Sequence, residues 1–355
     1  MYHSHRRHAL GPVPLLASLA LVALLAVACS NDASTRASSE EGPRPTAAPV
    51  SAPASIPAGT VLRVGDQLEY LQTVLALSDQ DQDFDYEVEY SSFVGGPPML
   101  QAFQGDALDA GFVASTPLLF AHAAGQDLAA VAGWGTEQGA SGLITADPEI
   151  DGWESLAGKR VAYQRGTSAE ATLLQELDAA GLSLEDVETV DVPITQVTAA
   201  LKGGSADAGI STEPLISLYL AETPDGAVVA KANRITDRTT FLIAPGATLD
   251  DPGKSAALAD FTTRLVKAFT DLNENSGLIA QSVYAEQYGL TPERAAAIVE
   301  ENGPTSFISL PGDIQEQQQA LADLFLAAGQ IPAEVDVAAE FDSRFNELVQ
   351  KEQGK

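Results

Sequence analysis

From Thr60 onward, short hydrophobic blocks alternate with polar ones in two different rhythms. Residues 61–64, 86–90 and 111–113 form short apolar or alternating runs that predict strands, while residues 71–77, 97–103 and 117–124 predict helices. Pro97 and Pro98 stand where a helix can begin, because the first turn of a helix needs no backbone N–H donor. Strands and helices that alternate in this way favour an α/β fold with a largely parallel sheet.

The second half of the chain repeats this theme, with predicted strands at 159–163 and 187–192 around a predicted helix at 169–180. The run AFQGDALDAG at 102–111 returns 98 positions later as ALKGGSADAG at 200–209, and each copy is followed by Ser-Thr ahead of a proline. A helix that ends at Gly before a turn and a strand is common in α/β proteins. Ten positions of shared spacing, followed by the same Ser/Thr and Pro, predict two related lobes that face a cleft.

Residues 1–28 are typical of an export signal, because Arg6 and Arg7 precede an apolar run at 15–28. That run is short for a membrane span of about 20 residues. Cys29 follows small residues and resembles the lipobox of bacterial lipoproteins, although Leu25 stands one place earlier than usual. We therefore expect Cys29 to be lipidated; the alternative is a plain signal peptide with an incidental Cys. Residues 29–59, rich in Ser, Ala, Pro and Thr, predict a disordered tether.

The charge and composition exclude several classes of function. The chain holds 49 acidic and 19 basic residues, for a net charge of -30, which disfavours nucleic acid as a partner. Only one Cys is present, and His122 is the one histidine beyond the first ten residues, where we expect a surface or packing role. Nucleophilic Ser–His and Cys–His systems therefore have little material.

Binding motifs for metals and cofactors are also missing from the sequence. Asp79, Asp81, Asp83 and Asp85 alternate, but the Gly and the terminal Glu of a calcium loop are absent, so we expect a solvated acidic loop. Neither the phosphate-loop signature nor the dinucleotide fingerprint occurs. We expect no cofactor and no metal.

Three predicted helix starts could bind a small anion. These helix starts lie at residues 93–98, 114–117 and 165–169, each after a predicted strand, and they carry Gly, Ser and Thr. In open α/β sheets ligands bind beyond the carboxyl ends of strands, where free N–H groups at helix starts favour anions. Each segment alone is more often only a helix cap, but three at one cleft predict a site of neutral donors for an oxyanion.

The ordered set of motifs resembles the lipid-anchored or periplasmic solute-binding proteins of ABC importers for aliphatic sulfonates, taurine and nitrate. It includes FVGGPPML at 93–100, GDALDAGFVASTP at 105–117, LAGKRVA at 156–162, RGTS at 165–168 and Glu213-Pro214. The resemblance implies a two-lobe, type II periplasmic-binding-protein fold with a ligand cleft between the lobes. The implied lobes are 60–145 together with 244–355, and 146–243, with hinges near 142–146 and 241–244 and C-terminal helices that return to the first lobe from about Asp260.

By the same resemblance, the ligand contacts map onto strand ends and loops of both lobes: Asp66, Gln67, Gly95, Gly96, Ser115, Thr116, Gly166, Thr167, Ser168 and Glu213. The sequence departs from the family at Asp66, Ser115 and Thr212, where an aromatic residue, Asp and Trp are usual. Lost aromatic walls and added hydroxyls favour a smaller or more polar ligand, or a shifted pocket. Acidic residues such as Glu69 and Glu213 leave a zwitterion such as taurine open. Candidate counter-charges are Arg165, Arg234 and Arg238.

The resemblance implies a receptor, not an enzyme, that closes on a small sulfonate-like solute and delivers it to an ABC permease. We expect a monomer on the extracytoplasmic face of the membrane, held through Cys29. One alternative is a desulfinase-like enzyme on the same scaffold, which the scarcity of Cys and His disfavours. Receptors for nitrate, taurine or a pyrimidine-type precursor, and an anchored scaffold without a ligand, are further alternatives.

Overall fold

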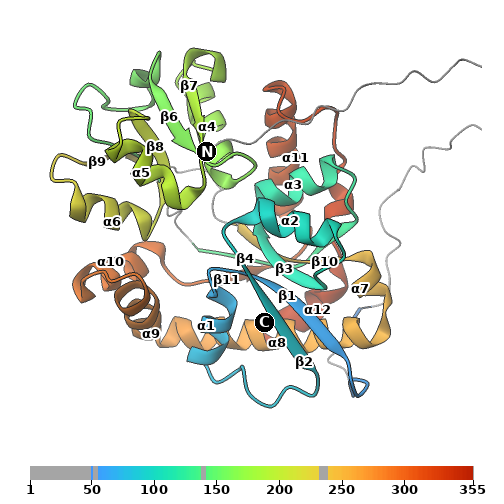
Figure 1. Cartoon of the computed structure of the whole chain (residues 1–355). Helices are drawn as coiled ribbons and strands as arrows, with labels where there is room; N and C mark the ends of the chain where they lie inside the picture. The colour runs from blue at the N-terminus through green and yellow to red at the C-terminus, as the bar shows by residue number, and fades with distance from the viewer. Residues whose placement is uncertain (1–48, 51–54, 137–140, 232–238, 355) are drawn as a thin grey trace, which may run out of the picture. The chain divides into compact units, whose positions relative to one another are not determined.

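The computed structural model describes residues 49–50, 55–136, 141–231 and 239–354. All of them belong to the compact unit Glu41–Lys355, which is distinct from the unit Met1–Glu40. The predictions for the export signal, Cys29, Arg234 and Arg238 concern residues outside the described ranges. The fold below is that of the larger unit (Figure 1).

Six strands form the first sheet, in the order β11-β4-β10-β3-β1-β2. They are β1 (Val61–Gln67), β2 (Glu87–Phe93), β3 (Ala110–Ala114), β4 (Leu128–Gly135), β10 (Thr239–Pro245) and β11 (Ser306–Ile308). β1 runs parallel to β2 and β3, whereas β10 is antiparallel to β3 and β4. Successive residues of β4 enter different core clusters, Ala129 and Val131 on one face, Leu128 and Ala130 on the other. The strand is therefore apolar without alternation, as a strand covered on both faces must be.

Five strands form the second sheet, in the order β7-β6-β8-β5-β9. They are β5 (Ser141–Thr145), β6 (Arg160–Tyr163), β7 (Glu188–Asp191), β8 (Ala208–Thr212) and β9 (Ala227–Lys231). β6 is parallel to β7 and β8, and β8 pairs with the antiparallel β5. The first sheet has the same arrangement in β2, β1, β3 and β10. The prediction of two similar halves is confirmed in strand order and direction.

The predicted hinge positions are wrong. Residues 142–145 lie within β5, and residues 241–244 lie within β10, where both neighbouring strands bond them. The chain passes from the first sheet to the second between Gly135 and Ser141, and it returns between Lys231 and Thr239. The hinge positions implied by the family resemblance therefore fall on buried strands, a few residues from the two crossings between the sheets.

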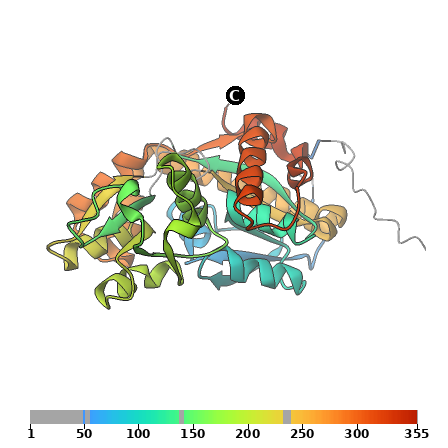
Figure 2. The same cartoon turned by 90° about the horizontal axis from the view of Figure 1, so that it is seen from above.

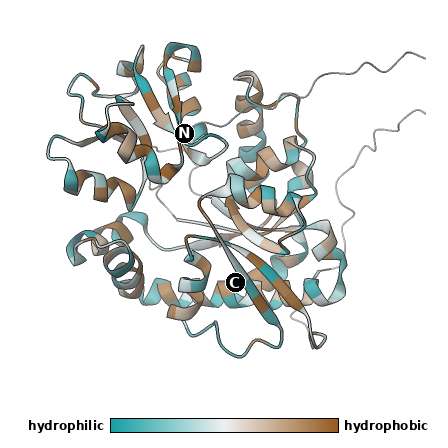
Figure 3. Ribbon diagram, in the orientation of Figure 1, coloured by the Kyte–Doolittle hydropathy of each residue, from teal (hydrophilic) through white to brown (hydrophobic). Residues whose placement is uncertain are grey.

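Helices cover both faces of each sheet, and hydrophobic residues run along the strands (Figure 3). The longer ones are α1 (Tyr70–Leu77), α2 (Gly96–Gln104), α3 (Ser115–Ala123), α4 (Ser168–Ala179), α6 (Leu215–Glu222), α8 (Pro252–Glu274), η5 (Ala280–Gln287), α10 (Pro292–Asn302) and α11 (Gly312–Ala327). The shorter ones are α5 (Val197–Lys202), α7 (Gly246–Asp250), α9 (Ser276–Ile279), α12 (Asn346–Glu352), η1 (Trp153–Leu156), η2 (Leu184–Asp186), η3 (Ile194–Gln196), η6 (Val337–Glu340) and η7 (Ser343–Phe345).

The C-terminal helices pack against elements of both halves of the fold. α8 packs against α1 and β1 of the first sheet, as predicted for helices that return to the first lobe. α8 begins at Pro252 rather than near Asp260, because the Asp251 carboxylate accepts the N–H groups of Gly253 and Lys254 and so caps the helix. α11 lies beside α4 of the second half, where Phe325 and Leu321 share a buried cluster with Leu174 (Figures 1 and 2).

The last residues of the predicted tether lie on the body. The Val50 N–H donates to the Arg344 carbonyl at 2.8 Å, and Val50 and Ile56 pack against the core of the first sheet. The Pro-rich composition of this segment predicted a tether, and its two apolar residues were the sign that part of it packs on the body. The folded body therefore includes residues that precede Thr60 in the sequence.

Candidate functional site

The predicted cleft corresponds to a cavity of about 620 Å³ at the carboxyl ends of strands from both sheets, here called the strand-end cavity. From the first half it is lined by Gln67, Leu68, Glu69, Ser92, Val94, Gly95, Gly96, Ala114 and Pro117. From the second half it is lined by Gln164, Thr167, Ser168, Ala169, Ile194, Thr195, Thr212, Glu213, Pro214 and Leu215, and from η5 and its end by Gln287 and Tyr288. Its volume lies in the range of small-molecule sites.

Four helix N-termini converge on the strand-end cavity. Its lining includes the starts or N-caps of α2 (Gly95, Gly96), α3 (Ala114), α4 (Thr167, Ser168) and α6 (Pro214, Leu215). Of these four N-caps, only Thr167 accepts a backbone N–H through its side chain, that of Ala169 at 3.3 Å. The positive ends of the four helix dipoles favour an anion in this cavity, and at α6 the Ser217 N–H already donates to Glu213 Oε2 at 3.3 Å.

Among the described residues, the side chains that line the cavity carry no positive charge. This described lining contains no Arg, Lys or His, and its two acids are Glu69 and Glu213. Glu213 is already engaged, because its Oε1 accepts Arg294 Nη2 at 2.7 Å and its Oε2 accepts the Ser217 hydroxyl at 2.6 Å. Within the described lining, the positive potential therefore comes from helix ends.

Six of the ten predicted contact residues line the strand-end cavity: Gln67, Gly95, Gly96, Thr167, Ser168 and Glu213. Asp66, Ser115, Thr116 and Gly166 are not part of its lining. Which of the ten touch a ligand stays a prediction.

Asp66 is a fully buried cap of α1. Its carboxylate accepts the N–H groups of Leu71 at 3.0 Å and Gln72 at 3.1 Å, as well as the Gln72 side-chain amide at 3.2 Å. Burial raises the pKa of Asp66, although these hydrogen bonds act to lower it. The N-terminus of α1 thus already holds an anion that belongs to the chain itself.

The other three residues outside the lining are next in sequence to residues that belong to it. Ser115 and Thr116 are buried, and within the described ranges their hydroxyls have no hydrogen-bond partner. Gly166, at φ 70°, donates its N–H to the buried Glu170 carboxylate at 2.7 Å. Burial is the largest influence on Glu170 and raises its pKa.

Glycine is required at the two loop positions that approach other walls of the cavity. Gly95 has φ 86°, and a Cβ there would lie 3.3 Å from the amide nitrogen of Gln164 in the second half. A Cβ at Gly96 would lie 2.7 Å from Pro117. The backbone at this loop therefore lies too close to its neighbours for a larger residue.

Of the candidate counter-charges, Arg165 can be placed. Its guanidinium donates to Gln330 Oε1 at 2.8 Å and lies 3.8 Å from Glu170, and it is not part of the lining. The arginine that does reach a cavity acid is Arg294 in α10, which the sequence analysis missed. Thr291-Pro292 signals the start of α10, but nothing in the sequence pairs residue 294 with Glu213.

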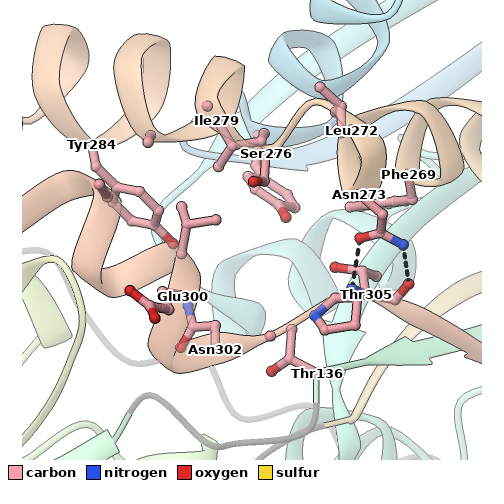
Figure 4. A pocket seen from close by; sticks show the side chains of 17 residues that line it. Thr136, Phe269, Leu272, Asn273, Ser276, Ile279, Tyr284, Glu300, Asn302 and Thr305 are labelled. Carbon is pink, nitrogen blue, oxygen red and sulfur yellow. Dashed lines mark hydrogen bonds between the residues drawn. The ribbon is translucent and has the colours of Figure 1, made fainter.

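A second cavity, of about 530 Å³, is built by the C-terminal helices (Figure 4). Phe269, Leu272, Ile279 and Tyr284 give it apolar walls, and the Asn273 side chain pairs with both the N–H and the carbonyl of Thr305. Tyr70, where α1 begins, also lines it, but the first turn of α1 already donates to Asp66. The anion-binding features of the strand-end cavity are thus not repeated here.

Comparison with known proteins agrees with this geometry. Residues 92–236 match the NMT1/THI5-like family model. The aliphatic sulfonates-binding protein of Escherichia coli (strain K12) is 28% identical over 283 residues, which cover 78% of this chain and 86% of the relative. That of Bacillus subtilis (strain 168) is 27% identical over 268 residues, or 73% of this chain and 77% of the relative.

Solved structures with a similar fold span both sheets of this chain. The alkanesulfonate-binding protein SsuA from Xanthomonas axonopodis pv. citri, bound to MOPS, has a TM-score of 0.71 at 27% identity and covers 81% of this chain and 99% of its own. The periplasmic aliphatic sulphonate binding protein SsuA from Escherichia coli has a TM-score of 0.65 at 27% identity, with coverages of 79% and 91%. The chain is similar to aliphatic sulfonate-binding proteins in both sequence and fold. Its fold is that of the periplasmic binding proteins, as predicted.

These relatives are named as binding proteins rather than enzymes. The family-model match spans the helix starts of α2, α3, α4 and α6 and ends before β10, so Gln67 and Arg294 lie outside it. Within the described ranges, no helix is both long and apolar enough to cross a membrane.

Proposed function

We propose that this protein is an extracytoplasmic receptor that binds a small organic sulfonate in the strand-end cavity and delivers it to an ABC importer. The observation that carries the proposal is the convergence of four helix N-termini on one cavity, whose described lining includes no basic side chain. Backbone N–H groups can bind a sulfonate without a counter-ion, since the dipoles favour negative charge. The relatives named for aliphatic sulfonates support the same ligand class.

The walls of the cavity favour an alkyl-bearing anion over nitrate. Leu68 and Val94 are more than one-third exposed at the cavity, and Ile194 and Leu215 add aliphatic surface. Burying such surface against an alkyl group contributes about 25 cal/mol per Å². Nitrate would leave this surface exposed and most of the 620 Å³ unfilled.

Isothermal titration of the purified protein tests the ligand. We expect heat with ethanesulfonate, butanesulfonate and MOPS, and a weaker signal with nitrate or with pentanoate, which has the butyl chain of butanesulfonate but carries a carboxylate. Tight binding of nitrate or of a pyrimidine precursor alone would replace the proposed ligand class. A sulfinate incubated with the protein should release no sulfite if the role is binding rather than desulfination.

The attachment and the domain motion are further parts of the proposal. Lipidation at Cys29 would keep the receptor at the membrane, and a Cys29→Ser variant should lose acyl labelling. The two lobes, predicted as 60–145 with 244–355 and as 146–243 and built here on the first and second sheets, would close on the ligand, which small-angle scattering detects as a smaller radius of gyration. The same measurement tests the expected monomer.

A further inference from the structure

Glu213 presents an electrostatic problem for an anion site. It lines the strand-end cavity immediately before the N-terminus of α6, where a sulfonate would lie if the proposed function is right. Like charges that face each other across a binding interface cost several kcal/mol. A free carboxylate at this position would therefore oppose the ligand that the helix ends attract.

The guanidinium of Arg294 meets this carboxylate from outside the cavity. Its Nη2 donates to Glu213 Oε1 at 2.7 Å, and its Nε donates to Ser217 Oγ at 2.7 Å. Ser217 Oγ donates in turn to Glu213 Oε2 at 2.6 Å, and the Ser217 N–H donates to the same oxygen at 3.3 Å, so both carboxylate oxygens are bonded within the protein. Arg294 itself does not line the cavity.

Arg294 is held in place by its own helix. Its Nη1 donates at 2.8 Å to Oε1 of Glu301, which lies further along the same helix. Glu301 also pairs with Lys231 at 3.5 Å. Thr291 Oγ1 accepts the Arg294 N–H at 3.3 Å and caps α10 at the same point. The guanidinium is therefore held between Glu213 and Ser217 on one side and Glu301 on the other. The charges of Glu213, Arg294, Glu301 and Lys231 sum to zero.

We propose that Arg294 is a positioning residue that sets the charge selection of the strand-end cavity, by keeping Glu213 neutralised and bonded away from the ligand. This inference rests on the proposed function. With Arg294 present, the cavity accepts a simple anion although acids line it. Without Arg294, the Glu213 carboxylate repels an alkanesulfonate, whereas a ligand with an ammonium group offsets part of that repulsion.

Ethanesulfonate and taurine form a matched ligand pair, because they differ by one ammonium group. In Arg294→Met, which keeps the aliphatic stem, we expect ethanesulfonate affinity to fall about tenfold or more and taurine affinity to fall less. The double variant Arg294→Met/Glu213→Gln also removes the unpaired charge of Glu213. It should restore ethanesulfonate affinity to within about threefold of wild type, since the repulsion is then gone. The loss in the single variant should shrink in high salt.

Lys202→Met is the control. Lys202 pairs with Glu222 at the other end of α6, so the variant changes the net charge by the same amount and disturbs the same helix without touching the cavity. It should leave ethanesulfonate affinity unchanged. Thermal unfolding shows whether Arg294→Met folds; if it does not, Arg294→Gln removes the charge while keeping donors toward Ser217, and the same pattern is expected.

The outcomes separate the two proposals. If wild type binds neither sulfonate, the proposed function fails and this inference fails with it. If wild type binds ethanesulfonate and Arg294→Met binds it equally well, only the role of Arg294 is overturned. Equal losses for both ligands that Glu213→Gln does not restore would mean that Arg294 acts on the fold and not on charge selection.

Discussion

Arg63 holds Asp109 through two side-chain hydrogen bonds, Nη2 to Oδ1 at 2.6 Å and Nε to Oδ2 at 2.9 Å, while the Arg63 N–H bonds the same Oδ2 at 3.0 Å. Arg160 repeats every one of these contacts on Asp207. The remaining nitrogen of each guanidinium donates to a carbonyl three residues before the acid, that of Asp106 or of Gly204. The clamp thus fastens the turn that enters β3 to β1 in one sheet, and the turn that enters β8 to β6 in the other.

Asp109→Asn should destabilise the protein more than Asp207→Asn. The Asp109 side chain is 3% exposed and also bonds Lys254, whereas the Asp207 side chain is 26% exposed. Because Arg63 is itself one-third exposed, we expect a loss of about 2 kcal/mol for Asp109→Asn, below the usual cost of breaking a fully buried pair. Urea unfolding at pH 7 measures both variants, and equal losses would contradict the role assigned to burial.

The same variant should lose its deficit in acid. Burial acts to raise the pKa of Asp109, but the hydrogen bonds from Arg63 and Lys254 outweigh it and hold the pKa below its ordinary value. A lowered folded-state pKa contributes stability above the unfolded pKa of about 4, and that contribution is lost as the pH falls through the folded value. The difference between wild type and Asp109→Asn should therefore shrink below about pH 4.

The repeat in the sequence located half of this clamp. The shared pattern ends in Asp-Ala-Gly, so Asp109 and Asp207 were visible as a pair, together with the helix ends and the strands that follow. The arginines were not visible, because they lie 46 and 47 residues earlier in strands whose neighbours in the sheet the sequence does not reveal. Alternating apolar blocks predicted β1, β2, β3, β6 and β7 and their helices, because local pattern determines where an element forms. The arginines of the clamp were missed because the pairing of strands depends on contacts between residues far apart in the sequence.

The candidate site divides in the same way. Helix starts at Gly95, Thr167 and Ser168 could be read from local Gly, Ser, Thr and Pro chemistry, and the structure brings them to one cavity. Asp66 directly follows a strand, as a ligand contact would, yet its carboxylate bonds the next helix of its own chain. Arg294 lies 81 residues from Glu213, and only the packing of α10 beside α6 reveals their contact.

Glu340 should make the protein less stable as the pH rises. It is fully buried in η6, and neither carboxylate oxygen has an assigned partner within the described ranges. Burial raises its pKa well above the ordinary value. A raised folded-state pKa means that the stabilisation is complete below the unfolded pKa, about 4.3, and is lost as the pH rises through the folded value.

Glu340→Gln should remove this dependence, because the amide stays neutral. Compared with wild type, its free energy of unfolding should gain at most about 1.4 kcal/mol per pH unit above pH 5, until Glu340 of the wild type is ionised. Glu347→Gln, an exposed change on α12, is the matched control and should shift nothing. Parallel pH profiles for wild type and Glu340→Gln would show that Glu340 does not titrate in this range.

Asp66→Ala should lower stability by about 1–2 kcal/mol, since two N–H groups of α1 lose their acceptor. Asp66→Asn keeps one acceptor oxygen and should lose less. Thermal unfolding measures both, and titration with ethanesulfonate at a temperature where each variant is folded separates capping from ligand contact. A loss of affinity without a loss of stability would return Asp66 to the ligand site.

Ser168→Asp should abolish or strongly weaken sulfonate binding while the protein remains folded. Ser168 is the first residue of α4 and lines the strand-end cavity, so an added carboxylate takes the position that favours a negative charge. Acids near a helix N-terminus stabilise the helix by about 0.3–1 kcal/mol, and the melting temperature should therefore hold or rise. Ala199→Asp adds the same charge to the first turn of α5, at an exposed position outside the cavity, and should bind sulfonates like wild type. If Ser168→Asp binds ethanesulfonate as tightly as Ala199→Asp does, the anion does not lie at the start of α4, and the ends of α2, α3 and α6 must hold it instead.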